Sequence, residues 1–96
     1  MSTSHPDSVL SRNFTIKNKF GLHARPSASF VQTASRFRSQ IQVENDGRVA
    51  DGKSILDLMT LAAAQGTCIT VRAIGEDAPE AMDALGSLIE GGFGEN

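Results

Sequence analysis

Residues 21–26 read Gly-Leu-His-Ala-Arg-Pro and mark the start of a helix. Proline lacks a backbone N–H but already has a helical φ, so Pro26 suits the first turn of a helix. Apolar and small residues then recur at helical spacing. The stretch therefore predicts a loop that ends at His23 and a helix that begins with Ala24 and Arg25.

His23 has the chemistry of a phosphoryl acceptor. A neutral imidazole nitrogen is a good nucleophile near neutral pH. The first N–H groups of a helix have no partner within it and lie at the positive end of its dipole. A phosphoryl group on His23 would therefore meet the N–H groups of Ala24 and Arg25. The alternative is a histidine that only caps the helix or lies on the surface.

Helix stability does not explain the presence of an arginine at position 25. A cation in the first turn opposes the helix dipole and costs about 0.3–1 kcal/mol. A guanidinium also donates charged hydrogen bonds to phosphate oxygens. We expect Arg25 to balance the charge of a phosphoryl group on His23, and the alternative is a solvated first-turn residue.

A second helix begins at Ser54. A serine hydroxyl accepts a hydrogen bond from an unpaired N–H of the first turn, and an acidic residue three positions later completes a capping pair. Ser54 and Asp57 have this spacing, and Ile55 and Met59 follow on one side of the helix. We predict a short amphipathic helix capped by Ser54.

Four segments alternate apolar and polar residues, which is typical of half-buried strands. They cover residues 14–17, 40–44, 48–50 and 69–73, and Asn45-Asp46-Gly47 predicts a hairpin between the second and third. The predicted fold class is α+β with the order βαββαβα. Three helices in this order can cover one face of a four-stranded sheet and leave the other face wet.

The first and last helices each show an apolar stripe. In the first helix the predicted inner residues are Ala24, Ala28, Val31, Ala34 and Phe37. In the last helix they are Met82, Leu85, Leu88 and Ile89. Asp77 and Glu80 predict a capping pair at the start of the last helix, and Gly91-Gly92 predicts its end.

The composition excludes several classes of protein. The chain has 96 residues, enough for one domain with one small core. Its formal net charge is −2 and its Lys and Arg residues do not cluster, so we expect no nucleic-acid partner. Its single cysteine excludes an internal disulfide and a cysteine-based zinc site. We expect no metal and no cofactor, because His5 has no ligand partner and Gly52-Lys53-Ser54 lacks the upstream P-loop glycine.

Residues 1–8 are mostly polar, and we predict a disordered N-terminal tail over residues 1–10 and one domain over residues 11–96. The longest apolar run is too short to cross a bilayer, and the tail lacks the apolar core of a secretory signal. We therefore expect a cytoplasmic monomer with no membrane partner.

The segments 21–26 and 51–59, together with Gln65-Gly66-Thr67, closely resemble the HPr family, the histidine phosphocarriers of the bacterial phosphotransferase system. The resemblance covers residues 13–93 and implies an HPr-like open-faced β-sandwich, an antiparallel sheet with its first and fourth strands paired centrally. It implies phosphorylation of His23 on Nδ1, with the group received from enzyme I and passed to a IIA protein or domain. The chain is then a carrier and not an enzyme.

The resemblance also extends to regulation. In part of the family the serine that matches Ser54 is phosphorylated by a dedicated kinase, so Ser54 is a candidate regulatory site with a serine kinase and phosphatase as partners. Asp57 and the tail at residues 91–96 look more like the nitrogen-related branch of the family than the sugar-transport branch.

A carrier that serves two partners needs a docking surface beside its reactive residue. The predicted docking residues are Phe20, Leu22, Ile55, Leu56 and Met59. Leu56 falls off the inner stripe of its helix, whereas a core position is the alternative for Met59. The alternative function is a regulatory protein-binding module of the same fold, which the presence of both His23 and Arg25 disfavours.

Overall fold

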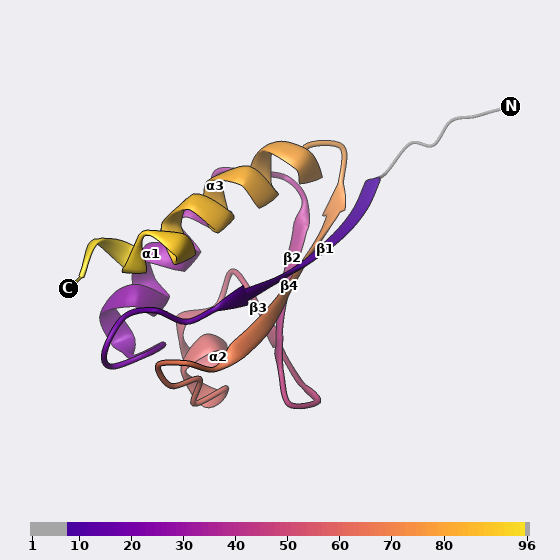
Figure 1. Ribbon diagram of the computed structural model, residues 1–96. Coiled ribbons are helices and arrows are strands. Elements are labelled where there is room, and N and C mark those ends of the chain that lie inside the picture. The colour runs from indigo at the N-terminus through magenta and orange to yellow at the C-terminus, as the bar shows by residue number, and fades with distance from the viewer. Residues whose placement is uncertain (1–7, 96) are drawn as a thin grey trace, which may run out of the picture.

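The computed structural model describes residues 8–95, which form the predicted βαββαβα order (Figure 1). The strands are β1 (Ser8–Thr15), β2 (Gln40–Asn45), β3 (Arg48–Asp51) and β4 (Cys68–Gly75), and the helices are α1 (Ala24–Ala34), α2 (Ile55–Thr60) and α3 (Ala78–Glu90). A short 3-10 turn, η1 (Gly92–Gly94), follows α3. The predicted set of strands and helices is confirmed.

The strands form one antiparallel sheet in the order β1-β4-β2-β3. The expected pairing of the first and fourth strands is confirmed, with Phe14 opposite Ile69. The expectation that both are central is wrong, because β1 lies at an edge. The reason is the hairpin of β2 and β3, whose turn residues Asp46 and Gly47 have positive φ. Strand β4 has β1 on one side and β2 of this hairpin on the other. The hairpin therefore adds no strand beyond β1, and β1 has β4 as its one neighbour in the sheet.

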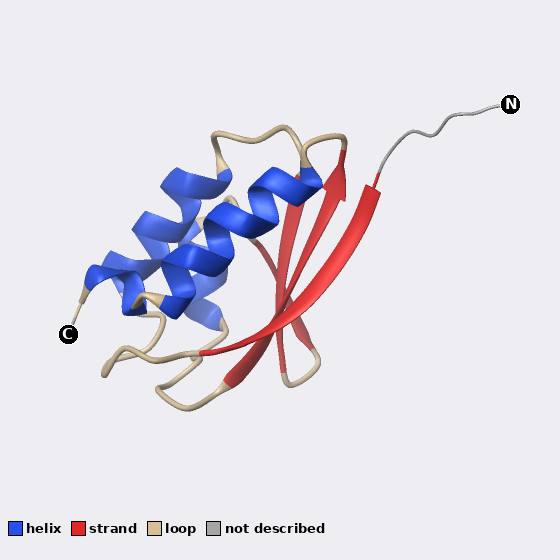
Figure 2. Cartoon of the chain, turned by 45° about the horizontal axis from the view of Figure 1, so that its top comes forward, coloured by secondary structure: helices blue, strands red, loops and turns tan. Residues whose placement is uncertain are grey.

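All three helices cover the same face of the sheet, as predicted (Figure 2). The core lies between the two layers, and its largest fully buried side chains include Ile16, Phe30, Ile41, Leu58, Ile69, Met82 and Leu85. The opposite face of the sheet is polar. There the Nη2 of Arg72 lies 3.4 Å from Oε1 of Glu44, and the hydroxyl of Thr70 donates to Asn13.

The buried face of α1 differs from the prediction. Ala24 and Ala28 are exposed, whereas Ser27 and Phe30 are buried. Phe30 sets the orientation of the helix, because burying its ring removes far more apolar area from water than burying an alanine does. Ser27 can lie beside it because its hydroxyl donates a 3.1 Å hydrogen bond to the carbonyl of Leu22.

β1 begins before the predicted end of the tail. The tail boundary after residue 10 is wrong, because Val9 and Leu10 belong to the strand. They pair with Ile74 and Ala73 of β4, and Leu10 packs against the core. The remainder of the predicted tail, residues 1–7, lies outside the described residues.

Asp77 does not cap its own helix. It precedes α3 but its side chain makes no capping hydrogen bond, so the predicted pair with Glu80 is wrong. Its carboxylate instead accepts hydrogen bonds from the backbone N–H groups of Arg38, at 2.8 Å, and Ser39, at 2.9 Å, and from the Ser39 hydroxyl. These hydrogen bonds lower the pKa of Asp77, and the bond from the Ser39 hydroxyl has the largest effect. Asp77 therefore joins the loop before β2 to the start of α3.

The end of α3 agrees with the sequence analysis. The helix stops at Gly91, and Gly92 takes a positive φ of 66° that turns the chain back. None of the helices in residues 8–95 has both the length and the apolar character that a bilayer crossing needs.

Candidate functional site

His23 lies directly before α1, as predicted. Its backbone is extended, and its carbonyl accepts a 3.0 Å hydrogen bond from the N–H of Ser27. The N–H groups of Ala24 and Arg25 come before this first helical bond, so they have no partner within the helix. The structure thus brings the imidazole and two unpaired backbone donors to the same end of α1.

Gly21 allows the loop before His23 to pack closely against the segment after α2. Its φ is +65°, and a Cβ at this position would overlap the carbonyl oxygen of Ala63. The N–H of Leu22 donates a 2.9 Å hydrogen bond to the same oxygen. The Leu22 side chain is only 4% exposed and belongs to the core. The prediction that Leu22 is a docking residue is therefore wrong, because this backbone contact turns its side chain inward.

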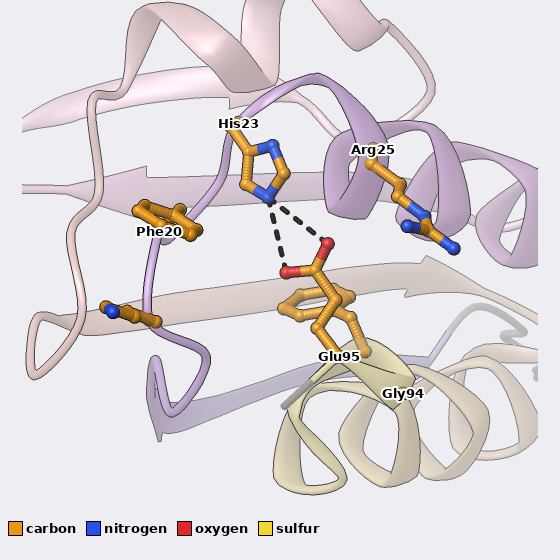
Figure 3. Close-up of a pocket in the computed structure, with 7 residues that line it drawn as sticks. Phe20, His23, Arg25, Gly94 and Glu95 are labelled. Carbon is orange, nitrogen blue, oxygen red and sulfur yellow. Dashed lines mark hydrogen bonds and ion pairs between the residues drawn. The ribbon is translucent and has the colours of Figure 1, made fainter.

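The imidazole of His23 faces the carboxylate of Glu95 (Figure 3). Nε2 lies 3.2 Å from Oε1 and 3.2 Å from Oε2 of this glutamate. Nδ1 lies on the side of the ring that faces α1, and it has no hydrogen-bond partner within residues 8–95. The side chain of His23 is 40% exposed, so Nδ1 is open to a reactant while Nε2 is occupied.

The carboxyl group of Glu95 is held in its ionised form. Burial raises its pKa, but the hydrogen bonds with His23 and Asn18 and the positive charges of His23 and Arg25 together outweigh burial, and the pKa is lowered. A carboxylate can only accept hydrogen bonds. The group that faces Nε2 is therefore an acceptor at neutral pH.

Asn18 connects Glu95 to the loop before His23. Its Nδ2 donates to the carbonyl of Gly21 at 2.8 Å and to Oε1 of Glu95 at 3.0 Å. The residue is 2% exposed, so both hydrogen bonds are made by a buried amide. One side chain thus joins the end of the chain to the loop that carries the imidazole.

The segment after α3 brings Glu95 to the site. Phe93 is 8% exposed and has a positive φ of 59°, so its ring is fixed in the core while the backbone turns. Sequence analysis did not find Glu95 or Asn18 as site residues. The available signal was Phe93, an apolar residue beyond the Gly91-Gly92 stop, which indicates that the tail packs back onto the domain.

A cleft of about 550 Å³ opens beside the imidazole. Its lining residues are Lys19, Phe20, His23, Arg25, Phe93, Gly94 and Glu95. Phe20 is 70% exposed and meets His23 edge to face, with ring centroids 6.1 Å apart. Arg25 is exposed on the first turn of α1, and its guanidinium points away from the imidazole (Figure 3). Besides the imidazole, the cleft thus presents two cations, two phenyl rings and the carboxylate of Glu95 to an incoming group.

Four of the five predicted docking residues are exposed. Phe20, Ile55, Leu56 and Met59 are 70%, 39%, 75% and 39% exposed, and we refer to them as the apolar patch. A second hollow joins the Phe20 and Met59 side chains beside His23. Leu58 is the one buried residue of α2, so this six-residue helix turns most of its apolar side chains outwards.

Ser54 caps α2 as predicted. Its hydroxyl oxygen accepts a 3.2 Å hydrogen bond from the N–H of Asp57. The carboxylate of Asp57 reaches back to the N–H of Asp51, at 3.2 Å, and not to that of Ser54. The neighbouring Lys53 donates from Nζ to the carbonyl of Phe37. Ser54 is thus flanked by two carboxylates and adjoins Leu56 of the apolar patch.

Within residues 8–95, no three His, Cys, Asp or Glu side chains gather closely enough to hold a metal ion.

Comparison with known proteins identifies the family. The family pattern described as "PTS HPr component phosphorylation site" matches residues 10–91. This chain belongs to the HPr family. Phosphocarrier protein HPr of Neisseria meningitidis is 54% identical over 88 residues, which cover 91% of this chain and 98% of that protein.

Solved HPr structures share the fold. HPr-C-His from Thermoanaerobacter tengcongensis has a TM-score of 0.87 at 50% identity and covers 91% of this chain and 98% of its own. A structure described as an HPr dimer from the same organism has a TM-score of 0.73 at 54% identity, with coverages of 85% and 94%. The chain is therefore an HPr phosphocarrier of the phosphotransferase system, a carrier and not a catalyst.

Proposed function

We propose that His23 accepts a phosphoryl group from phosphorylated enzyme I and passes it to a histidine of a IIA protein. One observation carries the assignment to His23: its Nδ1 is open and faces the end of α1 where the N–H groups of Ala24 and Arg25 have no helical partner. In the transfer, the Nδ1 lone pair forms a bond to phosphorus. The bond from phosphorus to the donor nitrogen breaks, and its electron pair returns to the donor ring.

Arg25 supplies charge balance in this proposal. Its guanidinium lines the cleft beside His23 without contacting the imidazole. A phosphoryl group on Nδ1 brings negative charge to this side of the ring, and the arginine fork can then donate to its oxygens. The partner proteins supply the in-line positioning of the reactants.

The apolar patch is the proposed docking surface for both partners. Large exposed apolar side chains beside a reactive residue provide the desolvated contact area that a transient complex needs. Leu56 and Phe20 are the most exposed of these side chains. Lys19 and Arg25 line the cleft beside the apolar patch, and their positive charges complement acidic groups on a partner.

Ser54 is a proposed site of regulatory phosphorylation by a serine kinase and of dephosphorylation by its phosphatase. Its hydroxyl lies at the start of α2, two residues before Leu56 of the apolar patch. A phosphate there would place about 1.5 to 2 negative charges at the docking surface and beside Asp57, so it would weaken partner binding.

We propose that the protein works as a monomer in the cytoplasm, where phosphoenolpyruvate charges enzyme I. A monomer suits a carrier that presents one surface to two partners in turn. The solved HPr dimer makes this a question for sedimentation or light scattering. Asp57 and the sequence of residues 91–96 support the nitrogen-related branch of the family. A transfer assay with sugar-type and nitrogen-type IIA proteins would decide between the branches.

Phosphate incorporation tests the proposed function directly. Incubation with enzyme I and phosphoenolpyruvate should add one phosphate that is labile in acid and stable in alkali. A folded His23→Ala protein should take up none, because the acceptor nitrogen is absent. Uptake by His23→Ala equal to that of the unaltered protein would rule out the assignment.

A further inference from the structure

The environment of the two imidazole nitrogens of His23 is unequal. Nε2 lies 3.2 Å from both carboxylate oxygens of Glu95, whereas Nδ1 has no hydrogen-bond partner within residues 8–95. In a neutral imidazole one nitrogen carries a proton and the other a lone pair. A carboxylate has no proton to donate at neutral pH, so it stabilises the tautomer whose proton is on Nε2.

The carboxylate itself is held in place by a buried amide. Asn18 donates from Nδ2 to Oε1 of Glu95 at 3.0 Å and to the carbonyl of Gly21 at 2.8 Å. Because Gly21 belongs to the loop that carries His23, the amide fixes the distance between the loop and the tail. Phe93, buried two residues before Glu95, anchors the tail on its other side.

We propose that Glu95 and Asn18 are positioning residues that keep the proton of His23 on Nε2 and leave the lone pair on Nδ1. The inference rests on the proposed function, in which His23 is the phosphoryl acceptor. Glu95 acts on the imidazole, and Asn18 acts through Glu95. Neither residue touches the phosphoryl group.

The same contact favours the phosphorylated state. When Nδ1 bonds to phosphorus, the bond to the donor nitrogen breaks and its electrons stay with the donor ring. The proton on Nε2 of His23 does not leave, so the ring becomes an imidazolium cation. The Glu95 carboxylate then faces a full positive charge instead of a neutral N–H, and a charged hydrogen bond is the stronger of the two. Glu95 therefore shifts the phosphoryl equilibrium towards His23.

NMR of ¹⁵N-labelled protein measures the tautomer directly, in the absence of any phosphoryl donor. In the unaltered protein the signals of a neutral His23 should show the proton mainly on Nε2. In Glu95→Gln the ratio of the two tautomers should fall by about threefold or more, because the charged acceptor is lost at a partly exposed site. Glu90→Gln removes one carboxylate from the exposed end of α3, and it should leave the ratio unchanged.

Asn18 is tested by a double-mutant cycle. Asn18→Ala should lower the tautomer ratio, as Glu95→Gln does. The double variant should have the same tautomer ratio as Glu95→Gln alone, because Asn18 acts through Glu95. Melting curves select the temperature at which every variant is folded. Additive effects would remove Asn18 from the proposal.

Phosphoryl exchange with enzyme I provides the second measurement. At equilibrium, Glu95→Gln should hold a smaller phosphorylated fraction than Glu90→Gln or the unaltered protein. Equal tautomer ratios in Glu95→Gln and Glu90→Gln, or a proton mainly on Nδ1 in the unaltered protein, would overturn the positioning role. That result is separate from a failure of the proposed function, which would appear as a lack of phosphate uptake in the unaltered protein.

Discussion

The carboxylate of Asp77 accepts a 2.9 Å hydrogen bond from the backbone N–H of Ser39, a residue in the loop before β2. The bond joins two helix–strand connections that are distant in the sequence. It also gives Ser39, which is 1% exposed, a partner for its buried N–H. The contact predicts a pH dependence of stability.

Asp77→Asn should lower the melting temperature at neutral pH, because the ionised acceptor of three hydrogen bonds is lost. The pKa of Asp77 is lowered from its ordinary value of 3.8, so the folded chain binds its proton less readily than the unfolded chain does. The stabilisation is present above the ordinary pKa and is lost as the pH falls through the lowered folded value. Melting curves across this range should show the difference from the unaltered protein shrinking in acid. Asp83→Asn, at an exposed pair with Arg12, is the control and should show little difference at any pH.

Phe30→Ala tests which face of α1 is buried. Loss of a fully buried phenyl ring should cost about 3–5 kcal/mol of unfolding free energy. Ala28→Ser changes an exposed position of the same helix and should change the unfolding free energy by no more than about 0.5 kcal/mol. Denaturant titration measures both. A larger loss for Ala28→Ser than for Phe30→Ala would contradict the observed orientation.

Arg25→Ala should slow phosphoryl transfer to and from His23 and leave the fold intact. The side chain is exposed at the cleft and makes no hydrogen bond within residues 8–95, so its removal costs little stability. Loss of a charged donor near a transferring phosphoryl group should reduce the rate by about tenfold or more. Rapid-quench measurement with enzyme I gives the rate, and Arg38→Ala, exposed in the loop between α1 and β2, is the charge-matched control. Equal rates for the two variants would reduce Arg25 to a surface residue.

Leu56→Glu should weaken binding to enzyme I and to the IIA partner together. Leu56 is 75% exposed in the apolar patch, and a contact residue of this kind contributes about a tenfold difference in affinity or more. Stability should change by no more than about 0.5 kcal/mol, because the side chain is outside the core. Titration calorimetry beside melting curves measures both quantities.

Val49→Glu provides the matched control for Leu56→Glu. Val49 is 57% exposed on β3, outside the apolar patch. Like Leu56→Glu, this variant replaces an exposed apolar side chain with a carboxylate. It should bind both partners normally. A folded Leu56→Glu protein that also binds both partners normally would exclude α2 from the docking surface.

The sequence predicted the elements well because their signals are local. Alternation in the strands and the cap at Ser54 depend on residues within a few positions of one another. The orientation of α1 was not predictable in the same way. Alanines satisfy either face of a helix, and the burial of Phe30 depends on a core built from segments that are distant in the sequence.

The chemistry of His23 was predictable in part. Its place before α1 follows from Pro26 and the residues around it, all within one turn. Its partner Glu95 is 72 positions away in the sequence, and no local pattern links the two. The same holds for Asp77, whose spacing to Glu80 indicates a cap, whereas its hydrogen bonds go to a loop 38 and 39 residues earlier.

The return of the tail to the imidazole has a practical consequence for biochemical work on this protein. An affinity tag, a fluorescent fusion or a surface linker attached after Glu95 would begin beside His23, at the mouth of the cleft. Cleavage of the backbone between α3 and Glu95 would remove the acceptor that faces Nε2 and leave the sheet and the three helices whole. A preparation could then look pure and folded by every optical criterion and still differ in its phosphoryl exchange.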